Sequence, residues 1–259
     1  MMRRHLTFAC GPDTLVGTLD RASASGPTGL LLVSGGREIR SGSWGGQAQL
    51  AARLAAAGVP VLRYDRRGVG ESEGSDPGFQ GSREDIAAAL AAFRAAVPGL
   101  RKVIAFGNCD AAAALMLHGA ALGFDGLVLA NPWTLEDETA DAPPPAALRQ
   151  RYRAKLANPR EVLRLLSGGV NLGKLLGGLR QAASAPVKSG LVAGMAEALS
   201  RFAGPVTILL ASGDRTAQMF EAVWPGRDSR IQRHRSAGHS FSGEAAQIWL
   251  FERLIAAAS

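Results

Sequence analysis

The sequence predicts an α/β protein with a mostly parallel central sheet, flanking helices and an inserted helical cap. Three observations support this prediction. Short apolar and β-branched runs alternate with alanine-rich stretches of helical length, which is typical of a doubly wound sheet. One of the apolar runs ends abruptly in a turn of small residues around a cysteine, and the stretch 146–202 has helical patterns and no strand candidate. With 259 residues, the chain suits one large domain that carries an insertion.

The first expected elements are an antiparallel hairpin and then alternating strands and helices. Gly11-Pro12-Asp13 separates the two hairpin strands, because these residue types favour tight turns. Gly58 ends the first helix, as glycine commonly does. The hairpin strands, the next strand, the helix and the strand after it are expected at 5–9, 14–20, 29–34, 47–57 and 59–64.

A second helix is expected from Ser82 to residue 97. Ser82 is a favourable N-cap, and Glu84 and Asp85 lie in the first turn, where the helix dipole favours negative charge. Pro98 cannot continue the helix, so the helix ends before it. The elements that complete the first half of the chain are a strand, a helix and a strand, at 103–106, 111–121 and 126–130.

The turn after 103–106 has the form of a nucleophile elbow, with cysteine where serine usually stands. Such an elbow needs a small residue two positions before and two positions after the nucleophile, because the nucleophile sits on a strained turn between a strand and a helix. Gly107 and Ala111 flank Cys109 in this way. The alternative interpretation of so short a pattern is a buried structural cysteine.

An acid and a base follow Cys109 in the order that this kind of site requires. The strand expected at 206–211 leads into Asp214, and the strand expected at 231–235 leads into His239. Cys109, Asp214 and His239 are therefore the predicted catalytic residues.

Other candidate residues are weaker. Glu136 and Asp137 follow the strand 126–130 and offer an alternative position for the acid. No cluster of His, Cys and carboxylate residues has the spacing of metal ligands, and no helix opens directly after Gly68-Val69-Gly70 as a dinucleotide fingerprint requires, so neither a metal nor a cofactor is predicted. The other histidines are expected to be structural or solvated: His5, His118 and His234.

The inserted cap is predicted at 134–203, and the core at 1–133 and 204–259. The insert begins with an acidic run and Pro143-Pro144-Pro145, and helical periodicity then continues from 146 to 202. Gly204-Pro205 returns the chain to the sheet. Two more helices are expected in the second part of the core, at 216–224 and 243–258.

Many of the positive charges behind the net charge of +7 fall in one segment of the insert, 149–188, where Glu161 is the single acidic residue. A basic segment invites contact with an anionic head group or an anionic lipid surface, whereas an ordinary amphipathic lid with solvated arginines is the alternative. No nucleic-acid partner is predicted. The basic residues of the segment are Arg149, Arg151, Arg153, Lys155, Arg160, Arg164, Lys174, Arg180 and Lys188.

The N-terminal residues lack the apolar run of a secretory signal, and no apolar stretch reaches the roughly 18 residues of a membrane span. Only two cysteines occur, Cys10 and Cys109, and their positions give no reason for them to pair. We therefore expect a reducing compartment and a cytoplasmic protein, in which Cys10 is structural.

Several segments resemble known families. The loop 64–74 resembles the D-x-R-G-x-G-x-S loop that follows the fourth strand of many α/β-hydrolases. More narrowly, the segments 34–43, 107–112 and 129–133 resemble the exosortase A system-associated hydrolase 1 group, in which a cysteine elbow is the rule. This resemblance implies an α/β-hydrolase fold and a bacterial protein encoded near an extracellular-polysaccharide and protein-sorting system.

The resemblance also implies an oxyanion hole. One donor is the backbone N–H of the residue after the nucleophile, Asp110, and the other comes from the loop after the third strand, at Gly36 or, in an equally acceptable alignment, Arg37. A plain tight turn is the alternative interpretation of Gly35-Gly36. The Asp110 side chain is expected to point away from the thiol, because an adjacent carboxylate opposes thiolate formation.

These residues predict a hydrolase that acts on ester or thioester bonds of a small-molecule acyl substrate. A Cys109 thiolate, favoured by the helix N-terminus and by His239, would form an acyl-enzyme while Asp214 orients the imidazole. Two alternatives stay open: an acyltransferase with the same triad, and a catalytically silent protein that docks on a component of the exopolysaccharide or protein-sorting system.

Overall fold

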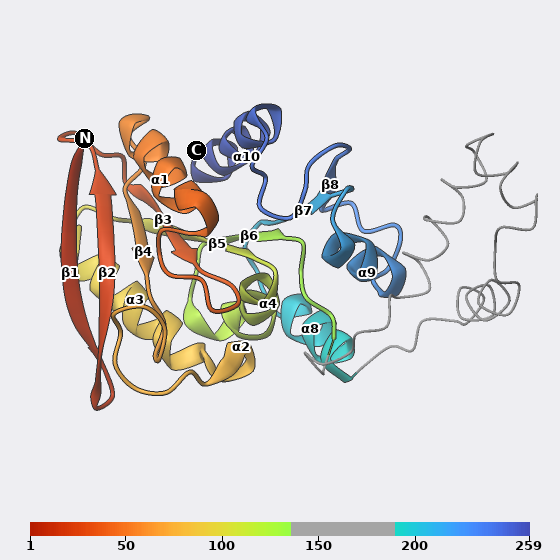
Figure 1. Cartoon of the computed structure of the whole chain (residues 1–259), viewed down its shortest axis with the longest axis horizontal. Coiled ribbons are helices and arrows are strands. Elements are labelled where there is room, and N and C mark those ends of the chain that lie inside the picture. The colour runs from red at the N-terminus through yellow and green to blue at the C-terminus, as the bar shows by residue number, and fades with distance from the viewer. Residues whose placement is uncertain (136–189) are drawn as a thin grey trace, which may run out of the picture.

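The computed structural model describes residues 1–135 and 190–259, which build a mixed eight-stranded sheet with helices on both faces (Figure 1). The strand order is β1-β2-β4-β3-β5-β6-β7-β8. β1, β2 and β4 pair antiparallel, and all pairs from β4 to β8 are parallel. The strands are β1 Met2–Cys10, β2 Asp13–Arg21, β3 Thr28–Val33, β4 Val61–Tyr64, β5 Lys102–Asn108, β6 Gly126–Ala130, β7 Val206–Ala211 and β8 Ile231–His234.

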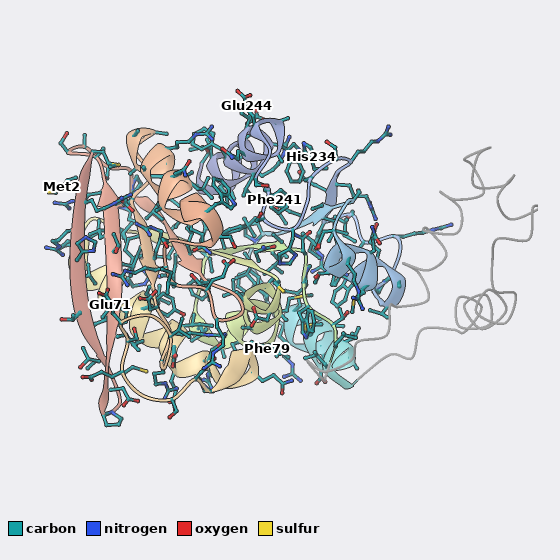
Figure 2. All side chains as sticks on the ribbon, viewed as in Figure 1. Met2, Glu71, Phe79, His234, Phe241 and Glu244 are labelled. Atoms are coloured by element: carbon teal, nitrogen blue, oxygen red, sulfur yellow. The ribbon has the colours of Figure 1, made fainter. Side chains whose placement is uncertain are left out.

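The described helices divide between the two faces of the sheet. α1 and α10 cover one face, while α3, α4, α8 and α9 cover the other. Figure 2 labels one aromatic ring from each side: Phe241 belongs to the cluster under α10, and Phe79 to the cluster under α3 and α4. The helices are η1 Ser43–Gly45, α1 Gly46–Ala56, α2 Gly78–Gly81, α3 Arg83–Ala96, α4 Asp110–Leu122, α8 Gly190–Ser200, α9 Arg215–Val223 and α10 Glu244–Ala258.

The central strands are buried on both faces, as their uninterrupted apolar sequences predict. Along β3, Leu31 and Val33 pack into the cluster beneath α3 and α4, and Leu30 and Leu32 pack into the cluster beneath α1 and α10. Successive side chains of a strand point to opposite faces, so one apolar run serves two helical layers. The predicted α/β-hydrolase fold is confirmed.

The predicted elements differ from the observed ones mainly at their ends. Both hairpin strands are longer than expected, and β4 begins at Val61 instead of residue 59, after Pro60. β8 ends at His234, whose ring packs edge-on against Trp249 with the ring centroids 5.4 Å apart. The short helices η1 and α2 were not expected, because neither is long enough to show a helical period.

Most of the predicted cap, residues 136–189, lies outside the described residues. Its last helix, α8, is described and packs against α4. Leu191, Val192, Met195 and Leu199 of α8 are buried in the core cluster on that side of the sheet. The end of the predicted insert therefore contributes to the core. None of the described helices is long and apolar enough to cross a membrane.

Candidate active site

The nucleophile elbow joins β5 to α4 at Cys109. Its backbone has a φ of 62° and a ψ of −126°, a conformation that non-glycine residues rarely adopt. A Cβ atom on Gly107 would lie 2.7 Å from the carbonyl carbon of Ala111, so the turn tolerates only glycine two residues before the cysteine. The Cys109 N–H donates to the Ala130 carbonyl at 3.0 Å, which fixes the elbow to the end of β6. The half-buried thiol is therefore held at the carboxyl edge of the sheet.

Asp214 and His239 meet at the same edge. Asp214 is the N-cap of α9, and its Oδ2 accepts a hydrogen bond from the Ala217 N–H at 3.1 Å. The same oxygen lies 3.0 Å from Nδ1 of His239. The carboxylate is buried, whereas the imidazole is 42% exposed. Because Asp214 takes Nδ1, Nε2 is the ring nitrogen left for the thiol of Cys109.

The surroundings of His239 favour its protonated form. The hydrogen bond to Asp214 and then the hydrogen bond to Cys109 raise the pKa of His239 to about 10, although partial burial opposes this. An imidazolium at neutral pH favours the thiolate on the sulfur beside it. The structure thus brings the three predicted catalytic residues together: His239 hydrogen-bonds to Asp214 and lies close enough to Cys109 for the thiol to raise its pKa.

The side chain of Asp110 turns toward the loop after β3 and the Arg66 guanidinium, and its expected orientation away from the thiol stays a prediction. Its Oδ1 accepts a hydrogen bond from the Gly36 N–H at 2.5 Å, and its Oδ2 lies 3.6 Å from Nη1 of Arg66. Arg66 is only 6% exposed and also donates to the Gly36 carbonyl oxygen. The guanidinium offsets the negative charge of Asp110, which lowers the electrostatic cost of a carboxylate in the residue after the nucleophile.

The loop after β3 packs on the elbow and binds the Asp110 side chain. The Gly36 N–H, expected to face the substrate, is taken by the Asp110 carboxylate in this structure. A Cβ on Gly35 would lie 2.5 Å from both Asn108 O and Asp110 Oδ1, so the loop packs directly on the elbow. Glu38 N–H donates to Gly35 O at 3.2 Å, which makes this segment a tight turn as well. The backbone N–H of Arg37 stays the alternative oxyanion donor.

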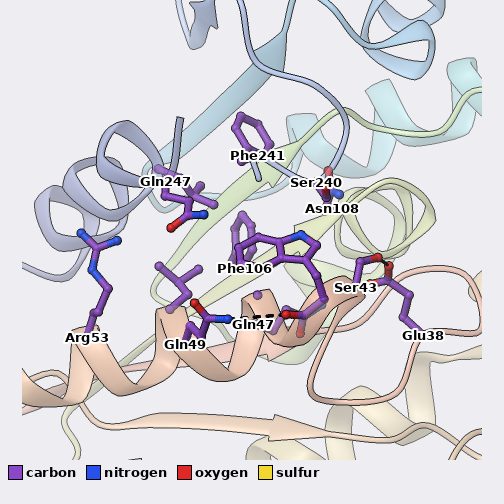
Figure 3. A pocket seen from close by; sticks show the side chains of 14 residues that line it. Glu38, Ser43, Gln47, Gln49, Arg53, Phe106, Asn108, Ser240, Phe241 and Gln247 are labelled. Carbon is purple, nitrogen blue, oxygen red and sulfur yellow. Dashed lines mark hydrogen bonds between the residues drawn. The ribbon is translucent and has the colours of Figure 1, made fainter. Parts of the chain in front are cut away.

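A pocket lies beside the catalytic group, between α1, α10 and the loop after β8 (Figure 3). Its cavity volume is about 70 Å³, and it opens to solvent. Asn108 and Ser240, the chain neighbours of Cys109 and His239, lie on its wall. The Ser43 hydroxyl donates to the Glu38 carboxylate on this wall. The neighbouring Arg37 pairs with another carboxylate, since its Nε lies 3.8 Å from Oδ2 of Asp76. The apolar lining residues are Trp44, Leu50, Phe106, Phe241 and Leu250.

Comparison with known proteins agrees with this geometry. A family model described as the alpha/beta hydrolase family matches residues 30–249. The chain belongs to this family. No curated protein matches the sequence.

Solved structures similar to this alpha/beta hydrolase share its fold at low sequence identity. A putative hydrolase from Agrobacterium vitis S4 is 16% identical, with a TM-score of 0.61, and the match covers 100% of this chain and 99% of the other. An alpha-beta serine hydrolase homologue from Coxiella burnetii is 14% identical, with a TM-score of 0.63 and the same coverage. An esterase from Pyrococcus furiosus is 15% identical, with a TM-score of 0.60, covering 100% of this chain and 92% of the other.

Sequence reasoning missed two groups of this alpha/beta hydrolase site. Arg66 belongs to the D-x-R loop, yet no local pattern indicated that it would reach the elbow. The carboxamides of Asn108 and Asn131 both donate to the His239 carbonyl oxygen. Both residues lie in segments that resemble a known family, but that resemblance did not indicate this contact. The alternative acids, Glu136 and Asp137, lie outside the described residues. Among residues 1–135 and 190–259, no group of three His, Cys, Asp or Glu residues is placed to hold a metal ion.

Proposed function

We propose that this alpha/beta hydrolase cleaves ester or thioester bonds through a covalent intermediate on Cys109. The observation that carries the proposal is the position of His239, whose Nδ1 lies 3.0 Å from Oδ2 of Asp214 and which is close enough to Cys109 for the thiol to raise its pKa. An imidazole held in this way serves a nucleophile in both halves of an acyl-transfer cycle. A buried structural cysteine would have no use for such a partner.

The chemistry follows from the protonation state of the pair. The Cys109 thiolate attacks the acyl carbon, and the carbonyl electrons move to oxygen. When this oxyanion collapses, the bond to the leaving alcohol or thiol breaks, and Nε2 of His239 gives that group its proton. Water then attacks the thioester while Nε2 removes a proton from it. Collapse of the second oxyanion breaks the C–S bond, which releases the carboxylic acid and restores the thiolate and the imidazolium.

The oxyanions need backbone donors, each of which typically contributes about 10²–10³ in rate. The N–H of Asp110 is the first proposed donor, because it lies at the N-terminus of α4 directly after the nucleophile. The second proposed donor is the N–H of Gly36 when the substrate displaces the Asp110 carboxylate from it. When the carboxylate stays in place, the second donor is the N–H of Arg37. Both arrangements place the negative oxygen close to the Arg66 guanidinium, which already contacts this loop.

The pocket beside His239 supports an acyl group as the part of the substrate that is bound. Its apolar residues, among them Phe106, Leu50 and Leu250, suit a hydrocarbon chain, while its carboxamides remain near the reacting end. The basic segment 149–188 is proposed to meet an anionic head group of the substrate or an anionic lipid. The narrower link to the exosortase-associated group and the cytoplasmic location remain predictions.

The test is the release of nitrophenol from short acyl esters, together with mass spectrometry after brief exposure to an acyl thioester. We expect an acyl adduct on Cys109 and loss of activity in Cys109→Ala. Cys10→Ala is the matched control, because Cys10 is the buried last residue of β1 and its thiol donates to Asp85, away from the triad. Equal activity in Cys109→Ala and the parent would remove Cys109 from the mechanism.

Product analysis then separates the two enzymatic alternatives. A thioester also passes its acyl group to amines and alcohols, so added acceptors would yield acylated products if the protein is an acyltransferase. A carboxylic acid as the main product in the presence of acceptors would support hydrolysis. No turnover and no adduct with any acyl donor would favour the docking protein.

A further inference from the structure

Asn131, the residue that follows β6, holds an unusual position among the described residues. It is fully buried and has a φ of 43°, in the left-handed region that asparagine tolerates better than most residues. Its side chain makes three hydrogen bonds. Nδ2 donates to Oδ1 of Asn108 at 2.9 Å and to the carbonyl oxygen of His239 at 3.2 Å, and Oδ1 accepts from the N–H of Ala211 at 2.8 Å.

Each of these three partners lies on a segment that carries one catalytic residue. Asn108 immediately precedes Cys109, Ala211 ends the strand that leads into Asp214, and the third contact is to the main chain of His239 itself. Asn108 adds a second donor to the same His239 carbonyl at 3.1 Å. One carboxamide therefore connects the elbow, the acid loop and the base loop.

The main chain around Asn131 strengthens this connection. Its own N–H donates to Leu209 O at 2.9 Å, which ties the segment to β7. On either side of it, Ala130 O accepts from the Cys109 N–H and the Trp133 N–H donates to Cys109 O, at 3.0 and 3.1 Å. The segment from Ala130 to Trp133 therefore holds both backbone polar groups of the nucleophile.

We infer that Asn131 is a positioning residue that sets the distance and direction of the His239 imidazole relative to Cys109. The inference rests on the proposed function, since it assumes that the two side chains act as a pair. Only a carboxamide fits this place, because two of its partners are oxygen atoms that need N–H donors and the third is an N–H that needs an acceptor. Aspartate keeps the acceptor but turns a negative oxygen toward Asn108 Oδ1 and His239 O.

The test is the pH dependence of Cys109 alkylation by iodoacetamide, which needs no knowledge of the substrate. All variants carry Cys10→Ala, so that one thiol is left. In the parent, the proposed imidazolium partner leads us to expect that Cys109 reacts well below the pH at which an ordinary thiol ionises, about pH 8.5. We expect Asn131→Asp and Asn131→Ala to lose about tenfold or more of this rate at pH 6 and to approach the ordinary profile.

Asp125→Ala is the matched control. Asp125 Oδ2 accepts from the Val103 N–H at 2.8 Å, so it also links β5 to β6 through a side-chain to backbone bond, but at the opposite edge of the sheet. We expect this variant to lose stability and to keep the parent alkylation profile. A folded Asn131→Asp or Asn131→Ala with the parent profile would overturn the inference.

A milder variant covers the case in which the Asn131 variants do not fold. Asn108→Ala removes one donor to His239 O and one acceptor for Asn131, while the bonds of Asn131 to His239 O and Ala211 N remain possible. If the alkylation profile of Asn108→Ala shifts in the same direction as expected for Asn131→Asp, but by less, the result supports positioning. If Asn108→Ala keeps the parent profile and the Asn131 variants do not fold, Asn131 has a purely structural role. If the parent itself shows an ordinary thiol profile, the proposed function fails instead.

Discussion

A carboxylate follows the nucleophile directly in this chain, and its surroundings explain how the site accommodates it. Asp110 is 7% exposed and binds both the Gly36 N–H and the Arg66 guanidinium. The negative charge is thereby offset by a cation and spread over a backbone donor. Like charges disfavour each other at short range, so this neutralisation matters for a carboxylate that directly follows a nucleophile.

Replacing Asp110 by asparagine keeps the shape of this contact and removes the charge. Without the carboxylate, Arg66 keeps Asp76, 3.5 Å away, but loses Asp110 as a negatively charged partner, and both changes favour a thiolate on Cys109. We expect the acid limb of the alkylation profile in Asp110→Asn to move to lower pH, by up to about one unit. Iodoacetamide kinetics between pH 4 and 9 measure this, and a limb that moves to higher pH would contradict the argument.

The titration of His239 gives a second prediction at this scale. Its pKa is raised from 6.5 to about 10, so the pair contributes stability fully below pH 6.5 and loses that contribution as the pH rises through 10. The imidazolium is also the acid for the leaving group, so acylation should weaken above pH 10. In Asp214→Asn, NMR titration of the ring protons should show a lower midpoint and an earlier alkaline fall. An unchanged midpoint would show that Asp214 is not the cause.

At the level of elements, the strand ends decide the chemistry. β5, β6 and β7 run parallel, so residues that follow them meet at one edge of the sheet. Cys109 follows β5, Asn131 follows β6 and Asp214 comes shortly after β7. The small residues around the elbow then allow α4 to start immediately after the nucleophile.

Gly107→Ala tests the crowding of the elbow. The added methyl group would lie 2.7 Å from the Ala111 carbonyl carbon and 2.9 Å from the Ala112 nitrogen, both of them backbone atoms of α4 that cannot move alone. We expect a loss of about 1–3 kcal/mol in the free energy of unfolding and a marked loss of Cys109 reactivity. Gly99→Ala is the control, because nothing lies within 4 Å of its new methyl group, and it should change stability by less than about 0.5 kcal/mol.

On the scale of the whole molecule, stability and catalysis rest on different ends of the sheet. The antiparallel part contains a buried ion pair in which Nη2 of Arg63 lies 3.0 Å from Oδ2 of Asp20, and neither side chain is more than 3% exposed. Burial lowers the pKa of Arg63 from its usual value, so the group depends on its carboxylate. This pair lies on β2 and β4, away from the strands that carry the triad.

Asp20→Asn should therefore destabilise the protein and spare the site. Removing one partner of a buried pair leaves an uncompensated charge, which typically costs about 3–5 kcal/mol. Chemical denaturation measures the loss, and the Cys109 alkylation rate of the folded fraction should match the parent. Arg233→Ala is the control: it breaks an exposed pair with Glu221 and should cost less than about 1 kcal/mol. Equal losses in the two variants would contradict the argument.

Much of this architecture was predictable because its signals are local. Apolar runs and helical periods located nearly all the described strands and long helices, although strand ends moved by a few residues. The elbow was recognisable since its need for small neighbours acts within five positions of the chain. The order of Cys109, Asp214 and His239 then followed from the strands that precede them.

Sequence alone thus determined the fold family, the elements and the candidate triad, because these depend on residue type and on neighbours in the chain. Only the tertiary structure decided that the Asp110 carboxylate turns toward Gly36, which is 74 positions away, and that Asn108 reaches His239 across 131 positions. The physical reason is that a side-chain rotamer is selected by whichever donor or acceptor the folded chain brings within about 3 Å. No local pattern records that distance.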